Sequence, residues 1–189
     1  MMRIILIVPF CLAAAACGGG DNGANDQEAA APPTIPAGTW NSEFEVKAFR
    51  STDKTTPALK AKEGDKEQAS SCVPGGQSER PPASLFSGAG YDCTYSNSYI
   101  KDGTINAALV CSRPELKGQV NMNVSGSYDA KSFEATVDST SYLPGDGDFT
   151  MSRHVKGKVT PGACQPAAPA ADAKGAAKGG AKPKAKAGG

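Results

Sequence analysis

Side chains able to do acid–base chemistry are few in this sequence and lie far apart. His154 is the single histidine among 189 residues, and it falls at an outward strand position, which favours a solvated surface histidine over a catalytic base. Glu43 and Glu45 lie about 7 Å apart on one strand face, a spacing also found between glycosidase carboxylates, but a solvated face explains both. No nucleophile-elbow motif is present. We therefore expect no catalytic residue and no enzymatic activity.

Residues able to bind metal are also sparse. Asp146 and Asp148 flank Gly147, but two carboxylates fall short of the about six to eight oxygen ligands that Ca²⁺ takes. Asp and Gly are ordinary turn residues, so turn formation explains this segment. A zinc site is the competing interpretation of the cysteines, yet they include no C-x-x-C pair and no nearby histidine. The sequence predicts neither a metal site nor a cofactor.

The N-terminus has the pattern of an export signal. Arg3 provides a short positive region, and residues 4–16 are thirteen apolar or small residues. This run is shorter than the ~20 residues that a membrane-spanning helix needs. We expect residues 1–16 to be a signal peptide that is removed from the mature protein.

The signal ends in Ala14-Ala15-Ala16-Cys17, which resembles the lipobox of bacterial lipoproteins, where the cysteine becomes the lipidated N-terminus. A lipid anchor on Cys17 is the prediction, and ordinary cleavage beside an unmodified Cys17 is the alternative. Gly18 follows, whereas Asp at this position commonly retains lipoproteins in the inner membrane. The expected location is the cell envelope, at the periplasmic face of the outer membrane, with the inner membrane as the second choice.

Two segments flank the expected domain. Residues 17–37 carry the lipidated cysteine and a flexible linker without the apolar periodicity that a folded segment needs. Residues 165–189 are an Ala/Lys-rich tail, expected to be disordered, whose charge suits an anionic envelope surface. The net charge of the whole chain is +1, which gives no field that would select nucleic acid. The tail holds five lysines: Lys174, Lys178, Lys182, Lys184 and Lys186.

Apolar and polar residues alternate in the region between these flanks, residues 38–164. The alternation occurs at residues 40–48, 105–111, 120–124, 133–137 and 149–155, and it indicates strands with one buried face. The turns between these strands are too short for the crossover helices of a parallel sheet. The predicted fold is therefore all-β, a single antiparallel meander sheet that is curved or barrel-like. Residues 51–71 show no such pattern and are expected to be irregular.

Facing residues of an antiparallel hairpin have numbers with a constant sum, which makes the register predictable. A hairpin centred on the Asp-Gly turn at residue 102 places Cys93 directly opposite Cys111. The last two hairpins place Val137 opposite Val124 on one side and opposite Val155 on the other. This register keeps the inward faces of the last three strands in phase.

The sequence holds six cysteines, of which one leaves with the signal peptide and Cys17 takes lipid. The remaining four lie in a compartment that permits disulfides, and four cysteines allow three pairings. The register favours Cys93–Cys111, so Cys72–Cys164 is the second predicted disulfide. The predicted domain of residues 38–164 is thus cross-linked by two disulfides.

Short motifs run through this domain in a specific order: Gly38-Thr39-Trp40, Cys72-Val73-Pro74, Pro81-Pro82-Ala83-Ser84-Leu85-Phe86, Asp92-Cys93-Thr94-Tyr95, Gly126-Ser127-Tyr128 and Gly162-Ala163-Cys164. The order of one tryptophan, four cysteines and turns resembles the domain of unknown function 3617 family, small secreted proteins and lipoproteins of Gram-negative bacteria. The resemblance implies export, disulfides and a β fold. The family carries no established activity, so the resemblance implies no chemistry.

Two function classes remain open. The expected one is a membrane-anchored, non-catalytic envelope binding or accessory module. Its aromatic residues either line a concave ligand-binding face or simply fill the core. The alternative is a structural or interaction lipoprotein whose basic tail contacts anionic lipid, cell-wall polymer or an acidic protein. The aromatic residues concerned are Trp40, Phe44, Tyr95, Tyr128, Phe133 and Phe149.

Overall fold

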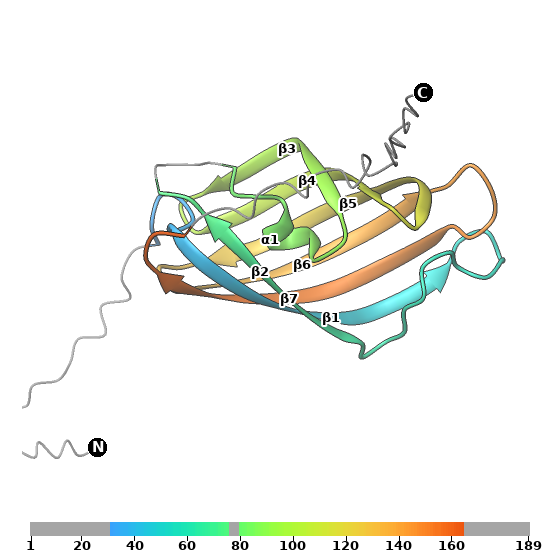
Figure 1. Ribbon diagram of the computed structural model, residues 1–189, viewed down its shortest axis with the longest axis horizontal. Coiled ribbons are helices and arrows are strands. Elements are labelled where there is room, and N and C mark those ends of the chain that lie inside the picture. Colours follow the sequence, from blue (N-terminus) through green and yellow to red (C-terminus); the bar gives the residue numbers. More distant parts are fainter. Residues whose placement is uncertain (1–30, 76–79, 165–189) are drawn as a thin grey trace, which may run out of the picture.

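The computed structural model describes residues 31–75 and 80–164, and within them all strands belong to one sheet. The sheet has the order β2-β1-β7-β6-β5-β4-β3, with every neighbouring pair antiparallel. It curls into a half-barrel (Figure 1), which confirms the predicted all-β class. The predicted linker before residue 31 and the predicted tail lie outside the described residues. The elements are β1 (Gly38–Ser51), β2 (Lys66–Val73), α1 (Ser84–Ser87), β3 (Asp92–Lys101), β4 (Thr104–Arg113), β5 (Leu116–Tyr128), β6 (Ser132–Tyr142) and β7 (Phe149–Pro161).

Strands β3 to β7 form the predicted meander, in which each strand pairs with the next along the chain. Strand β1 then pairs with β7 over almost its whole length, from Gly38 opposite Pro161 to Ser51 opposite Phe149. Strand β2 pairs with β1, so β2 and β3 are the two edges of the sheet. The connection between these edges carries α1 over the concave face (Figure 1). Among the described residues, no helix has the length and apolar character needed to cross a membrane.

Buried apolar and aromatic side chains pack together on the concave face and form the core. Trp40 and Phe133 pack with ring centroids 5.5 Å apart, and Phe86 of α1 meets Phe133 edge-on at the same distance. Gly157 of β7 lies opposite Phe133 of β6, and the Phe133 ring occupies the space that a Cβ at Gly157 would need. Five of the six aromatic residues expected either to bind ligand or to fill the core are buried, and the sixth, Tyr95, packs partly buried against them. These side chains therefore belong to the core.

The first hairpin of the meander reaches the predicted register by an unexpected route. Cys93 lies opposite Cys111, as predicted. The turn itself, however, is formed by the pair Asp102 and Gly103, with φ of 50° and 79°, so the hairpin is not centred on a single residue. A bulge at Ser96 absorbs the difference and brings the two cysteines face to face.

The last hairpin differs from its predicted register, whereas β5 and β6 pair as predicted. Val137 lies opposite Arg153 and not opposite Val155. The carboxylate of Asp148 accepts a hydrogen bond from the Leu143 N–H at 2.9 Å, which takes Leu143 out of the ladder. Because the slip is two residues, every side chain keeps its face, and the alternation alone could not detect it.

Two segments outside the meander are more ordered than predicted. Residues 66–71, expected to be irregular, belong to β2, an edge strand whose inward side chains are mostly small or polar and so give no apolar alternation. Ile35, placed by prediction in the linker, is buried. The Pro36 carbonyl accepts a hydrogen bond from Trp40 Nε1 at 2.9 Å. The chain therefore contacts the core before β1 begins.

Candidate functional site

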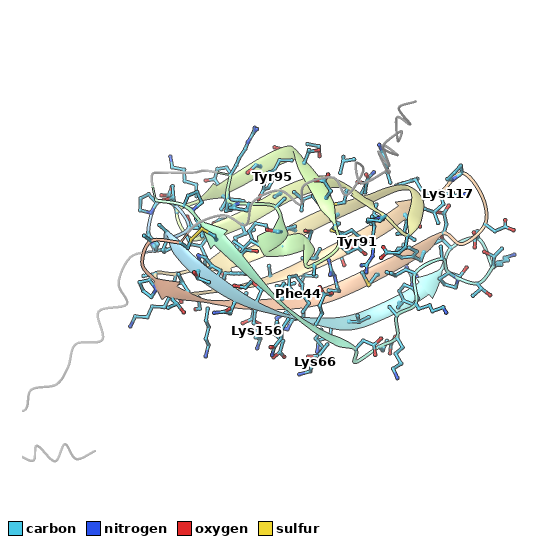
Figure 2. The ribbon with its side chains drawn as sticks, in the orientation of Figure 1. Phe44, Lys66, Tyr91, Tyr95, Lys117 and Lys156 are labelled. Carbon is cyan, nitrogen blue, oxygen red and sulfur yellow. A yellow bond between two sulfur atoms is a disulfide. The ribbon has the colours of Figure 1, made fainter. Side chains whose placement is uncertain are left out.

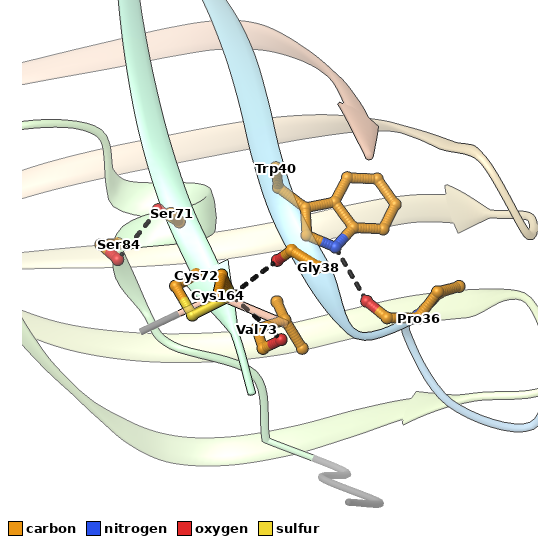
Figure 3. Close-up of a disulfide and its surroundings, with 8 residues drawn as sticks. All are labelled: Pro36, Gly38, Trp40, Ser71, Cys72, Val73, Ser84 and Cys164. Carbon is orange, nitrogen blue, oxygen red and sulfur yellow. Dashed lines mark hydrogen bonds between the residues drawn. A yellow bond between two sulfur atoms is a disulfide. The ribbon is translucent and has the colours of Figure 1, made fainter. Parts of the chain in front are cut away.

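The two disulfides hold opposite ends of the sheet. Cys72 and Cys164 are bonded with a Cα–Cα distance of 5.6 Å (Figure 3), and they join β2 to the chain just after β7. Strand β1 lies between these partners, and the Cys164 sulfur packs 3.2 Å from the Gly38 carbonyl oxygen. Cys93 and Cys111 join the β3–β4 hairpin. Both pairings are those predicted, and Cys17 lies outside the described residues.

The acid–base candidates are engaged in surface ion pairs. His154 lies at the predicted outward position, with Nε2 2.7 Å from Glu134 Oε1. Lys66 Nζ lies 3.0 Å from Glu43 Oε1 and 3.9 Å from Glu45 Oε2. These side chains are on the outer face, and Lys66 lies at the margin of the molecule in Figure 2. This arrangement is that of a solvated strand face.

The turn that carries the calcium candidates is built from carboxylates that accept protein hydrogen bonds. The Asp53 carboxylate accepts from the backbone N–H groups of Gly147 (2.7 Å), Asp148 (2.9 Å) and Thr55 (2.9 Å). The backbone N–H and hydroxyl of Thr55 are the largest causes that hold the pKa of Asp53 well below its usual range. Among residues 31–75 and 80–164, no group of three or more His, Cys, Asp or Glu side chains is placed to hold a metal ion.

A buried arginine is the feature that the sequence analysis missed. Arg153 occupies an inward position of β7 between Val46 of β1 and Val137 of β6, and it is only 3% exposed. Its Nη2 donates to the Ser87 carbonyl at 2.9 Å, and its guanidinium lies 5.1 Å from the centroid of the Phe44 ring. The sequence did hold one sign of its burial, because Arg153 falls between Met151 and Val155 at an inward position of the alternation in β7.

The charge of Arg153 has no close counter-ion among the described side chains. No carboxylate oxygen of these residues lies within 4.0 Å of its guanidinium, and its buried Nε has no hydrogen-bond partner. Burial lowers the pKa of Arg153, while Tyr91 and Glu67 act in the opposite direction. A guanidinium with a usual pKa above ~12 nevertheless keeps its proton in a protein.

A second arginine lies beside the first. The guanidinium carbon of Arg113 is 4.9 Å from the centroid of the Tyr91 ring, and that of Arg153 is 5.7 Å from the same ring. Arg113 Nε lies 3.0 Å from Glu115 Oε2. The positive charge of Arg113 further lowers the pKa of Arg153, so the two cations repel each other across one aromatic ring.

These arginines line a cleft of about 280 Å³ at the open side of the half-barrel. Phe44 and Tyr91, which contribute to its wall, both lie over the middle of the molecule in Figure 2. Apolar and aromatic residues make up one part of the lining, and four basic and two acidic residues make up the other, although the ammonium group of Lys66 pairs with Glu43 on the outer face. The lining residues are Phe44, Val46, Leu59, Ala61, Tyr91 and Met151, with Lys60, Lys66, Arg113, Arg153, Asp65 and Glu67.

A larger hollow of about 600 Å³ lies on the outer face of β1, β2 and β7. Its lining residues are polar or charged except Ala69, and they include Glu43, which pairs with Lys66, and Lys156, which lies 3.8 Å from Glu134. It contains no buried charged group. The smaller cleft, with its buried and unpaired guanidinium, is therefore the stronger candidate for a ligand site.

Fold and cleft together define a small, disulfide-bonded β half-barrel with a cationic cleft on its open side. The chain belongs to the family described as Protein of unknown function (DUF3617), whose family model matches residues 35–164. The match covers the half-barrel from the buried Ile35 to Cys164, and it confirms the predicted family. No curated protein and no solved structure matches the chain.

Proposed function

We propose that the protein is a membrane-anchored lipoprotein of the bacterial envelope whose half-barrel is a non-catalytic binding module. The observation that carries the binding role is the cleft, which combines apolar walls with polar groups that can orient a ligand. The acid–base candidates outside the cleft are occupied in surface ion pairs. The described side chains thus favour ligand capture over chemistry.

The envelope location rests on three features that agree with one another. Two disulfides within one small domain suit an oxidising compartment such as the periplasm. Residues 1–16 have the pattern of an export signal, and Cys17 follows it in a lipobox-like sequence. Gly18 favours the periplasmic face of the outer membrane over the inner membrane. Pro33, whose carbonyl accepts a hydrogen bond from the Asp102 N–H at 3.4 Å, and the buried Ile35 already contact the domain, so the proposed tether between lipid and domain is shorter than the predicted linker of residues 17–37.

Metabolic labelling with a radioactive fatty acid tests the anchor. Replacing Cys17 by Ser should abolish labelling and release the protein from the membrane fraction. The matched control is Cys11→Ser, which changes a cysteine that leaves with the signal peptide and should label normally. Undiminished labelling of the Cys17→Ser protein would overturn the anchor. Native mass spectrometry of protein from its own envelope tests the binding role by detecting a co-purifying small molecule.

The five tail lysines favour a second candidate function, an interaction lipoprotein. Residues 165–189 hold these lysines against one acidic residue, and each can contribute up to ~1 kcal/mol beside an anionic surface. This binding would be weak and salt-sensitive, because charges are screened over about 8 Å at physiological ionic strength. Removal of the tail separates this function from ligand capture by the half-barrel.

A further inference from the structure

Arg153 is a charged group that the described part of the fold buries without neutralising. Its guanidinium has one direct hydrogen bond to oxygen, from Nη2 to the Ser87 carbonyl, while Nε is buried and unpartnered. Burying a charge without a partner is costly, and removing an ion-pair partner from a buried charge typically destabilises a protein strongly. An anion in the adjoining cleft would supply the missing partner.

Among the described residues, Glu67 is the carboxylate whose charge raises the pKa of Arg153, yet it already accepts a hydrogen bond from another group. Its Oε1 accepts a hydrogen bond from the Ala89 N–H at 2.7 Å. Gly88 lies between the two groups, since a Cβ built on it would be 3.2 Å from Arg153 Nη1 and 3.1 Å from Glu67 Oε1. The carboxylate therefore influences the pKa of Arg153 from a distance without forming an ion pair with it.

We propose that the cleft binds a monoanionic carboxylate carried on a short apolar chain, with Arg153 as the anchor and Arg113 as the second cation. The inference rests on the proposed binding function and names its ligand class. Guanidinium groups match the planar geometry of a carboxylate and form strong charge-assisted hydrogen bonds with it. The Arg113 side chain, which is 25% exposed, and the part of the Arg153 guanidinium that lines the cleft donate to the carboxylate oxygens.

The walls of the cleft determine the rest of the ligand. Leu59, Ala61 and Tyr91 are partly exposed and offer apolar surface next to the cations, so a hydrocarbon chain gains burial there. Asp65 and Glu67 also line the cleft and repel a second negative charge, which disfavours a phosphate dianion. A volume of about 280 Å³ is close to the lower end of the ~300 to 1,000 Å³ of small-molecule sites, so the chain is short.

Isothermal titration with matched probes tests this ligand class on the full exported chain carrying Cys17→Ser, which is oxidised but not lipidated. The probes are octanoate, octanol, octylamine, acetate and inorganic phosphate. Octanol and octylamine keep the chain and change the head group, whereas acetate keeps the head group and removes the chain. We expect octanoate to bind about tenfold or more tightly than each of the others, which is the effect of roughly one charge-assisted hydrogen bond.

Two arginine variants locate the binding. Arg153→Met removes the charge at similar volume, and an apolar replacement of a buried charge often preserves stability. Octanoate affinity should fall about tenfold or more. Arg50→Gln is the matched control, because Arg50 lies on β1 outside the cleft and bonds Thr150 Oγ1 at 3.1 Å. Its octanoate affinity should match that of the parent chain.

Each outcome decides the proposal. Preference for octanoate, lost in Arg153→Met and kept in Arg50→Gln, supports it. Equal binding of octanoate and octanol overturns the carboxylate class and leaves the binding module in place. No binding of any probe overturns the inference, and co-purification of a neutral molecule would then show that the proposed binding function survives. If Arg153→Met does not fold, the comparison of probes on the parent chain still decides.

Discussion

The two disulfides should differ in what they contribute to stability, because they close loops of different length. Cys72–Cys164 spans 92 residues of sequence, whereas Cys93–Cys111 spans 18. The loop-entropy relation gives about 4.6 kcal/mol for the longer loop and about 3.2 kcal/mol for the shorter one at 25 °C. The expected difference is about 1.4 kcal/mol in favour of the bond that crosses β1.

Replacing cysteines by alanine would add a second effect, because Cys111 is 2% exposed and its sulfur fills core volume. The perturbation is therefore reduction of the one disulfide left in each of two double variants. Cys93→Ala with Cys111→Ala retains the long loop, and Cys72→Ala with Cys164→Ala retains the short one. Within each variant the oxidised and reduced proteins have the same side-chain volume, so the difference isolates the cross-link.

The assay is urea unfolding followed by the fluorescence of Trp40, the single tryptophan of the chain, which is 0% exposed when folded. Reduction should lower the unfolding free energy by about 4.6 kcal/mol when the long loop is opened and by about 3.2 kcal/mol when the hairpin loop is opened. Equal losses, or a larger loss from the hairpin disulfide, would refute the loop-entropy reasoning. The hairpin would then retain structure in the unfolded chain.

Three further changes have defined outcomes. Gly157→Ala should destabilise the fold by about 1 to 3 kcal/mol, because the added Cβ displaces the Phe133 ring. Gly145→Ala is the control, because a Cβ there meets nothing within 4 Å. Equal urea midpoints for the two variants would contradict the predicted clash at Gly157. The lowered pKa of Asp53 means that its carboxylate stabilises the fold above its usual pKa of about 4, and that this stabilisation is lost as the pH falls below that value. Asp53→Asn should therefore melt at a lower temperature than the parent at pH 7, and its melting temperature should fall less between pH 6 and pH 3. An equal fall in melting temperature for both proteins would show that Asp53 does not cause this acid sensitivity. Truncation after Cys164 should leave the thermal midpoint unchanged and reduce co-sedimentation of the unlipidated protein with anionic vesicles at low salt; equal co-sedimentation would remove the tail as a binding element.

Local sequence determined the parts of this fold that depend on neighbouring residues. Alternation of apolar and polar residues is a property of each strand by itself, because successive side chains point to opposite faces. It predicted the strands without reference to the rest of the chain, and the short turns between them excluded a parallel sheet. Close hairpin turns set the pairing of consecutive strands, and so the partnership of Cys93 with Cys111 was predictable. The second disulfide followed because two cysteines remained.

Only the tertiary structure decided which distant segments meet. No local signal indicates that β1 pairs with β7, since this contact depends on the curl of the whole sheet. The short polar strand β2 is held by its neighbour β1 and not by apolar alternation of its own. The register of the last hairpin differs from the predicted one by two residues, which leaves each side chain on the same face, so the apolar alternation gives no sign of the difference.

The cleft is the clearest case of this division. The sequence placed Arg153 in an inward phase, but a charged residue in such a phase can also sit at a solvated end of a sheet. Its burial depends on α1, which crosses the concave face and presents the Ser87 carbonyl to it, and on Tyr91 at the far edge. These groups come from segments far apart in the chain. Their convergence, and hence the site, is a product of the folded sheet.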